Sequence, residues 1–271
     1  MPKMVRILVD ADSIFFKIAL GPHRGAKNIK QAYNRFRNTM EIKVRNETVD
    51  PFSDDEFSIH YAVKGTGNFR KDLYPEYKAH RVKQDDEVRE RLNFLHTYSI
   101  ECGAVPADGM EADDLVSIWA YEAREKEEDY VICGIDKDLK QIPGTHYNYN
   151  KDTWDFVDDA TALRNLMLQC LTGDSADNIP GLKGIGPKKA EGILRDVPTN
   201  NLWDTVRATW VDHGVPNPEL SYRLLAMIKT WEEFEDVRAS LSSETSVSEC
   251  DDGKEQDVQD SSVQCVSERD T

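Results

Sequence analysis

The stretch that most constrains this chain is Gly109-Met110-Glu111-Ala112-Asp113-Asp114-Leu115, which places three carboxylates within four residues directly before an apolar helical run. At helical spacing Glu111 and Asp114 share a face, and Asp113 points about a quarter-turn away, toward solvent or the next layer. Unit charges about 4 Å apart repel by ~1 kcal/mol in water and ~4 kcal/mol at an effective dielectric near 20. A half-buried cluster therefore needs raised pKa values or a hard divalent cation, whereas a solvated helix start needs only the helix dipole.

Apolar runs at residues 5–9, 57–63 and 130–135 predict three buried strands. The first leads to Asp10 and a helical pattern, and the third leads to Asp136 and Asp138. Residues 24–50 are polar with a mostly helical pattern. Helices between strands imply an α/β fold with a mostly parallel sheet, whose ligands bind beyond the carboxyl ends of the strands.

Acids from three separate places are therefore expected to converge on one edge of this sheet. They are Asp10, Glu111, Asp113, Asp114, Asp136 and Asp138. A single Asp after a strand is often only a cap, but three such places together favour a metal site. The chain has no G-x-x-x-x-G-K-[ST] motif, so nucleotide hydrolysis is not expected.

A basic segment at residues 68–83 precedes the acidic stretch, and its cations interleave with aromatic side chains. The cations are Arg70, Lys71, Lys78, Arg81 and Lys83, and the aromatics are Phe69, Tyr74 and Tyr77. This composition suits gripping phosphates while stacking a base. An ordinary basic loop and helix is the alternative interpretation.

A second candidate phosphate site follows a helix predicted at residues 162–168. Asp174 and Asp177 come first, then Gly184-Ile185-Gly186, and then Pro187 at a position suited to the first turn of a helix. Exposed N–H groups at that helix start, with Lys188 and Lys189 beside them, form a sequence-independent phosphate clamp.

The rest of the chain divides into a helical part and a polar tail. Residues 200–241 are expected to be helical, with packing side chains at Trp203, Val206, Trp210, Leu220, Leu224, Leu225, Ile228, Trp231 and Phe234. Residues 242–271 hold nine acids against two bases, which accounts for seven of the sixteen net negative charges. This Ser-rich tail is predicted to be disordered.

The five cysteines are far apart and lack a C-x-x-C spacing, so they fit a reducing cytoplasm and give no zinc site. Cys133 and Cys170 are expected in the core. No long apolar run or charged leader is present, so neither secretion nor membrane insertion is expected.

Taken in order, these motifs resemble the 5′ nuclease family, which includes bacteriophage 5′-3′ exonucleases of the flap-endonuclease type and the 5′-nuclease domain of bacterial DNA polymerase I. The resemblance covers residues 4–197. It is carried by Val9-Asp10, Tyr77-Lys78 with Arg81, Glu111-Ala112-Asp113-Asp114, Asp136-Lys137-Asp138, and Gly173-Asp174 with Asp177-Asn178 running into Gly184-Ile185-Gly186. The lack of a polymerase segment and the closing helical part look more like a free-standing phage enzyme.

The resemblance implies a PIN-like, Rossmann-type catalytic domain at residues 1–160, a helix-hairpin-helix DNA-binding and helical subdomain at 161–241, and the tail at 242–271. It implies two Mg²⁺ ions, for which Mn²⁺ substitutes, and a K⁺ ion at the helix-hairpin-helix. By position, Asp10, Glu111, Asp113 and Asp136 would hold the metal pair, and Asp114, Asp138, Asp174 and Asp177 would complete the cluster.

The expected activity is metal-dependent 5′-3′ exonuclease or flap-endonuclease hydrolysis of duplex DNA at a 5′ end, nick or flap during phage replication. RNA primers and RNA–DNA hybrids are further expected substrates, and the enzyme is expected to be a monomer in the host cytoplasm. Lys78 and Arg81 would contact the scissile phosphate, and Tyr77 would stack near the terminal nucleotide. The residues expected to contact DNA elsewhere are Arg70, Lys83, Gly184, Gly186, Lys188 and Lys189.

One departure from the family lies at the end of the second strand, where an Asp usually stands. Residues 61–70 contain no acid, and Asp12 is the candidate to compensate. Two other readings therefore stay open: a structure-specific DNA-binding protein with weakened nuclease activity, and a PIN-type ribonuclease. A structural Ca²⁺ site would leave the basic segment unexplained.

Overall fold

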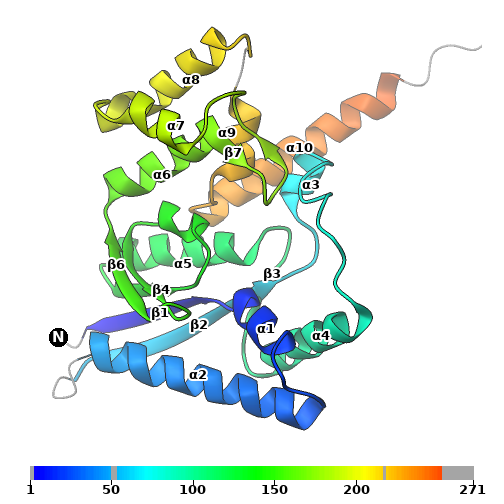
Figure 1. Ribbon diagram of the computed structural model, residues 1–271, viewed down its shortest axis with the longest axis vertical. Helices are drawn as coiled ribbons and strands as arrows, with labels where there is room; N and C mark the ends of the chain where they lie inside the picture. The colour runs from blue at the N-terminus through cyan, green and yellow to red at the C-terminus, as the bar shows by residue number, and fades with distance from the viewer. Residues whose placement is uncertain (1–2, 50–53, 216–217, 252–271) are drawn as a thin grey trace, which may run out of the picture.

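A six-stranded sheet forms the centre of the computed structural model, which describes residues 3–49, 54–215 and 218–251 (Figure 1). The strands lie in the order β3 (Val105–Ala107), β2 (Glu56–Lys64), β1 (Met4–Asp10), β4 (Asp129–Cys133), β5 (Gly144–Asn148) and β6 (Thr153–Val157). All neighbours pair in parallel except β5 and β6, which are antiparallel. The prediction of an α/β fold with a mostly parallel sheet is confirmed, although the sequence pattern had indicated only β1, β2 and β4.

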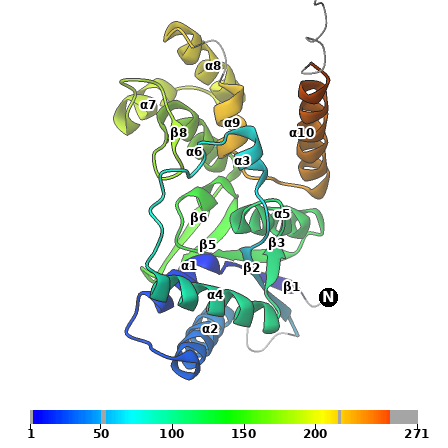
Figure 2. The ribbon, with the colours of Figure 1, turned by 90° about the vertical axis from the view of Figure 1, so that its right-hand side faces the viewer.

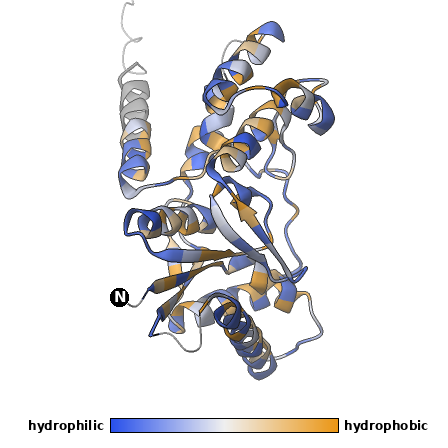
Figure 3. Ribbon diagram, turned by 90° about the vertical axis from the view of Figure 1, so that its left-hand side faces the viewer, coloured by the Kyte–Doolittle hydropathy of each residue, from blue (hydrophilic) through white to orange (hydrophobic). Residues whose placement is uncertain are grey.

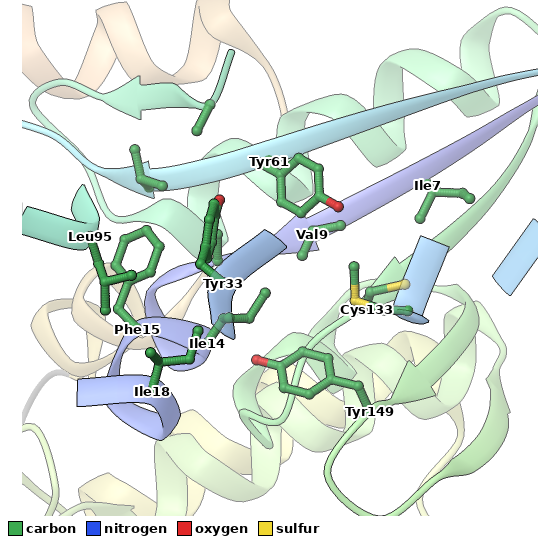
Figure 4. Packing of buried hydrophobic residues seen from close by; sticks show 14 of the residues in the cluster. Ile7, Val9, Ile14, Phe15, Ile18, Tyr33, Tyr61, Leu95, Cys133 and Tyr149 are labelled. Atoms are coloured by element: carbon green, nitrogen blue, oxygen red, sulfur yellow. The ribbon is translucent and has the colours of Figure 1, made fainter. Parts of the chain in front are cut away.

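Helices cover both faces of the sheet because the side chains of its central strands alternate. Ile7 and Val9 of β1 pack toward α1 (Asp12–Ala19), α2 (Ala26–Thr48) and α4 (Asp86–Glu101). Figure 4 shows this cluster with Tyr149 and Cys133 beside it. Leu8 packs on the opposite face toward α5 (Ala112–Glu125). Every central strand is therefore buried on both faces, as expected for a parallel sheet.

A helical layer with its own hydrophobic cluster stands beyond the α5 face of the sheet. It contains α6 (Asp159–Thr172), α7 (Pro187–Leu194), α8 (Leu202–Asp212) and α9 (Glu219–Leu225). Between α6 and α7 the chain forms a short hairpin of β7 (Gly173–Asp174) and β8 (Ile179–Pro180). Gly173 has φ +68, and a Cβ there would lie 2.3 Å from the backbone nitrogen of Gly181. This close crossing requires glycine.

The last helix, α10 (Trp231–Asp251), contacts α3 and α5 through its first turns and then extends away from the sheet (Figure 2). Phe234 is buried there, but Leu220 and Trp231, which the spacing predicted as packing residues, are 45% and 47% exposed. The helix also continues through residues 242–251, which the composition predicted to be disordered, while residues 252–271 of the predicted tail lie outside the described residues. Figure 3 shows hydrophobic and hydrophilic residues on different sides of the helices.

A buried ion pair connects the sheet to the helical layer. Arg70 of α3 (Phe69–Leu73) is 3% exposed, and Asp114 in the first turn of α5 is fully buried. Two guanidinium nitrogens donate to the two carboxylate oxygens of Asp114 at 2.5 and 2.8 Å. The same guanidinium donates to the backbone oxygens of Leu224 and Ala226 at 2.8 and 2.9 Å.

The predictions for both residues of this pair are wrong. Arg70 cannot reach DNA because its guanidinium is enclosed by protein. Asp114 also accepts hydrogen bonds from the backbone nitrogens of Ile228 and Glu111, at 3.1 and 3.0 Å. A carboxylate offers about four lone-pair sites, and four donors occupy them, so Asp114 has no free acceptor position for a metal ion.

Replacing Asp114 by Ala is expected to lower the free energy of unfolding by roughly 3–5 kcal/mol, because it leaves the buried guanidinium without its counter-charge. Urea denaturation would measure the loss. The control is Asp204→Ala, which breaks the exposed pair between Asp204 and Arg207 and should cost about 1 kcal/mol or less. Equal losses in the two variants would contradict a structural role for Asp114.

Candidate functional site

The predicted acids converge at the carboxyl edge of the sheet. Asp10 ends β1, Glu111 is the N-cap of α5, and Asp136 follows β4. Asp138 begins the short helix η1 (Asp138–Gln141), and Asp174 comes from β7 in the helical layer. These carboxylates form two groups, one around Asp10 and Asp138 and the other around Glu111 and Asp113.

The first group centres on Asp10, which is 8% exposed. Burial raises the pKa of Asp10 to about 7, and the negative charges of Asp12 and Asp136 add to the effect. The Ser13 hydroxyl donates to Asp10 Oδ2 at 3.3 Å and also shares a hydrogen bond with the hydroxyl of Tyr149. Asp10 therefore has a fixed orientation but no cationic partner among the described residues that would offset its charge.

Asp138 extends this group toward the helical layer. Burial raises the pKa of Asp138 to about 6, with a further contribution from Asp136. Asp136 is exposed, and its Oδ1 accepts from the backbone nitrogen of Asp138 at 2.9 Å. Burial also acts to raise the pKa of Asp174, but a 2.6 Å hydrogen bond from Lys137 Nζ outweighs burial and lowers it.

The second group lies at the start of α5, where Glu111 and Asp113 face a cavity of about 20 Å³ that Asp138 and Asp177 also line. Burial works against ionisation of Glu111, but Lys78 and Arg70 outweigh it and lower the pKa of Glu111. Burial and the charge of Glu111 raise the pKa of Asp113 well above its usual range. Asp113 lines this cavity and is partly exposed, whereas Asp114 is the buried member of the stretch.

Tyr77, Lys78 and Arg81 reach the second group from the basic segment. Lys78 Nζ binds Glu111 Oε1 and lies 3.4 Å from Asp177 Oδ2. Its backbone has φ +57, and its backbone nitrogen donates to the oxygen of Asp177 at 2.9 Å. Arg81 is exposed and lies 2.6 Å from Asp177 Oδ1. Both cations therefore lie at the acidic edge.

The prediction that Tyr77 stacks on a nucleotide is wrong. Its side chain is 2% exposed and packs in the cluster of the helical layer. Its hydroxyl binds Glu111 Oε2 at 2.9 Å and Asp177 Oδ2 at 3.1 Å. Tyr77 therefore positions two acids, one from each layer.

The residues of the predicted clamp are exposed around the start of α7. Pro187 occupies the first turn of that helix, and Gly184 has φ +80, which favours glycine. The exposed residues here are Gly184, Gly186, Lys188 and Lys189, and Lys83 of the basic segment is exposed as well. No atom within 4 Å would crowd a Cβ at Gly184 or Gly186, so both glycines leave room for a ligand backbone to approach.

The donor chemistry of this edge fits a hard divalent cation. Every candidate ligand is a carboxylate, and like charges contribute to the raised pKa values of Asp10, Asp113 and Asp138. Within the described ranges no three acidic, His or Cys side chains are close enough to hold an ion as they stand. Lys78 and Lys137 pair with Glu111 and Asp174 instead. The lysine and acidic side chains would therefore have to move before the acids could bind a metal ion.

Sequence reasoning missed several residues that orient the acids. Asn68 donates to Glu111 Oε1 at 3.0 Å, Gln169 donates to Asp138, and Tyr149 acts through Ser13 on Asp10. Asn68 also caps α3. An Asn in a capping position just before Phe69 and Arg70 was the one sequence signal that could have identified any of these residues. The others come from distant segments, and no local pattern marks them.

The comparisons with known proteins identify the family. A model of the 5′-3′ exonuclease, N-terminal resolvase-like domain, matches residues 6–165. The chain belongs to this family. It is 30% identical to the flap endonuclease Xni of Shewanella baltica over 191 residues, which are 61% of this chain and 71% of that protein. It is also 35% identical over 139 residues to DNA polymerase I of Rhizobium leguminosarum, covering 47% of this chain. The match spans only 14% of the polymerase.

Solved structures share the fold. A bacteriophage T5 flap endonuclease in a pseudo-enzyme–product complex with DNA and metal ions superposes with a TM-score of 0.61 at 17% identity. The match covers 92% of this chain and 97% of that one. A second T5 structure, crystallised with metal ions, gives 0.62 at 16% identity over 89% of this chain and 99% of that one. In the described part of the chain no helix is long and apolar enough to cross a membrane.

The raised pKa of Asp10 predicts a pH-dependent stability in the presence of a chelator. The folded chain holds a proton on Asp10 up to about pH 7 that the unfolded chain releases near its ordinary value of 3.8. This group's contribution to the free energy of unfolding therefore falls as the pH rises from about 4 to about 7. Asp10→Asn should flatten the profile measured by urea denaturation over this range.

The control is Asp155→Asn. Its exposed carboxylate has a pKa lowered by a hydrogen bond from Lys140, so removing it should not flatten the profile. Parallel profiles for wild type and Asp10→Asn would contradict the buried, like-charged environment of Asp10.

Proposed function

We propose that the protein is a divalent-metal-dependent 5′ nuclease that hydrolyses phosphodiester bonds at 5′ ends, nicks or flaps of duplex DNA. One observation carries the proposal: acids from four segments meet at one sheet edge, where Lys78 and Arg81 pair with Glu111 and Asp177. Membership of the 5′-3′ exonuclease family supports the same reading.

In this proposal Asp10 and Asp136 hold one ion, and Glu111 and Asp113 hold the other. Asp138, Asp174 and Asp177 lie around them and act on the ions through water. Mg²⁺, or Mn²⁺ in its place, would lower the pKa of a bound water and stabilise negative charge on the phosphate. Ser13 and Asn68 keep Asp10 and Glu111 in place, since each donates a hydrogen bond to its carboxylate.

Lys78 and Arg81 bind the scissile phosphate in this proposal. Both already lie at the acidic edge, where they pair with Glu111 and Asp177. Charge-assisted hydrogen bonds to a phosphate undergoing attack stabilise the transition state electrostatically. Lys78 pairs with both Glu111 and Asp177, so turning its ammonium group to the substrate requires breaking both ion pairs.

Duplex recognition is assigned to the start of α7. Lys188 and Lys189 together with the backbone at Gly184 and Gly186 would contact phosphates without reading bases, so DNA structure and not sequence selects the substrate. A bound K⁺ at this hairpin, a role in phage replication, and the removal of RNA primers belong to the same proposal. The K⁺ rests on the motif resemblance of residues 173–186, and the other two rest on the resemblance of the chain to phage 5′-3′ exonucleases.

Asp136→Ala is expected to reduce cleavage by at least about 10²-fold, a loss comparable to removal of one electrostatic catalytic group, while DNA binding persists. The assay uses 5′-labelled blunt, nicked and flapped duplexes with Mg²⁺, and product length separates mononucleotide release from flap release. Asp129→Ala is the matched control. Asp129 is exposed and begins β4, the strand that Asp136 follows, at the opposite edge of the sheet. Wild-type rates in Asp136→Ala would refute the metal assignment.

The double variant Lys188→Gln/Lys189→Gln should weaken binding of every duplex sequence alike. Each lost phosphate contact reduces the magnitude of the slope of log affinity against log salt concentration by about one, so binding depends less on salt. Fluorescence anisotropy in EDTA, which prevents cleavage, would measure the slope between low and moderate salt. Lys126→Gln removes an exposed lysine that follows α5 and should leave the slope unchanged; an unchanged slope in the double variant would remove the clamp from the proposal.

A further inference from the structure

The carboxyl end of β2 carries no acid of its own, yet a carboxylate lies there. β2 ends at Lys64, and both carboxylate oxygens of Asp12 lie 3.1 Å from the Lys64 backbone nitrogen, which donates to them. The backbone nitrogen of Ala11 donates to the oxygen of Ala62 at 3.0 Å. The chain after β1 thus stays joined to β2 and places the first residue of α1 at the end of the neighbouring strand.

Asp12 lies between the two groups of acids. Its backbone nitrogen faces Asp10 Oδ1 at 3.3 Å. Burial is the main cause that raises the pKa of Asp12, and the charge of Glu111 contributes in the same direction. The charge of Asp12 in turn raises the pKa of Asp10. Asp12 therefore interacts electrostatically with both Asp10 and Glu111.

The groups that face Asp12 do not saturate it. Lys64 contributes one backbone N–H, shared by the two oxygens, and the side chains of Lys64 and His96 act on Asp12 only electrostatically. His96 itself is engaged, because its ring nitrogen lies 2.6 Å from the backbone oxygen of Lys64. A carboxylate offers about four lone-pair sites, so Asp12 keeps acceptor capacity that Asp114, with four donors, lacks.

We propose that Asp12 is a direct ligand of the divalent ion held by Asp10, and that it supplies the carboxylate that β2 lacks at this edge. The assignment rests on the proposed nuclease function. It differs from a purely structural role, in which Asp12 would only tie α1 to β2 through the Lys64 N–H. The two roles are separable, because an amide oxygen can accept that N–H but carries no charge for a cation.

The test is a Mn²⁺ titration of the full chain followed by the electron paramagnetic resonance signal of free Mn²⁺, with flap cleavage recorded alongside. Asp12→Asn keeps an acceptor for Lys64 and should retain the wild-type midpoint in urea. It should nevertheless weaken one Mn²⁺ site by at least about tenfold, the lower range for loss of a group that supports a metal site. Asp12→Ala removes both acceptor and charge.

Asp108→Asn is the matched control. Asp108 also accepts a backbone N–H from the loop after β2, that of Thr66 at 2.8 Å, but it is exposed. Its replacement should leave both Mn²⁺ sites unchanged. An Asp12→Asn affinity equal to wild type, with Asp12→Ala lowering only the urea midpoint, would assign Asp12 to structure alone.

The experiment distinguishes failure of the nuclease function from failure of the Asp12 assignment. Wild type that neither binds Mn²⁺ nor cleaves a flap overturns the nuclease function and the Asp12 assignment together. Wild type that binds and cleaves, with Asp12→Asn matching it in both, overturns the Asp12 assignment only.

Discussion

The buried pair of Arg70 and Asp114 is the interaction on which the rest of the structure depends. It joins α3, the first turn of α5, and the segment between α9 and α10, which are far apart in the sequence. Replacing such a pair by apolar groups is often neutral, but leaving one charge alone is very unfavourable. The pair therefore fixes geometry: it holds the start of α5, and with it Glu111 and Asp113, against the helical layer.

Charges at the carboxyl edge fall into two kinds. Asp114 has a full set of donors, and Glu111 and Asp174 have lysine partners. Asp10 and Asp113 lie among other acids, and burial together with these like charges raises their pKa values. In a structural ion-pair network every acid would have hydrogen-bond donors or a lysine partner. Acids that lie among other acids, such as Asp10 and Asp113, therefore mark this edge as a ligand-binding site.

Prediction from the sequence succeeded where a local pattern coincides with a general rule of topology. The ends of parallel strands share an edge, so the meeting of Asp10 and Asp136 followed from two apolar runs. It failed for Arg70 and Tyr77, which lie in a segment that looks basic and exposed. Their burial is decided by partners 154 and 100 residues away, at Leu224 and Asp177. The sequence did not predict β5 and β6, because polar residues interrupt the apolar alternation of both strands. Tyr149, which directly follows β5 and lies near Asp10, was missed for the same reason.

The exposed start of α7 has a consequence for the way a polyanion meets this protein. With a net charge of −16, most orientations of an approaching phosphate backbone are electrostatically unfavourable. Lys188 and Lys189 at a helix N-terminus provide a local exception. Repulsion elsewhere disfavours other orientations of encounter, so under the proposed function the acidity of the chain would direct DNA toward the start of α7.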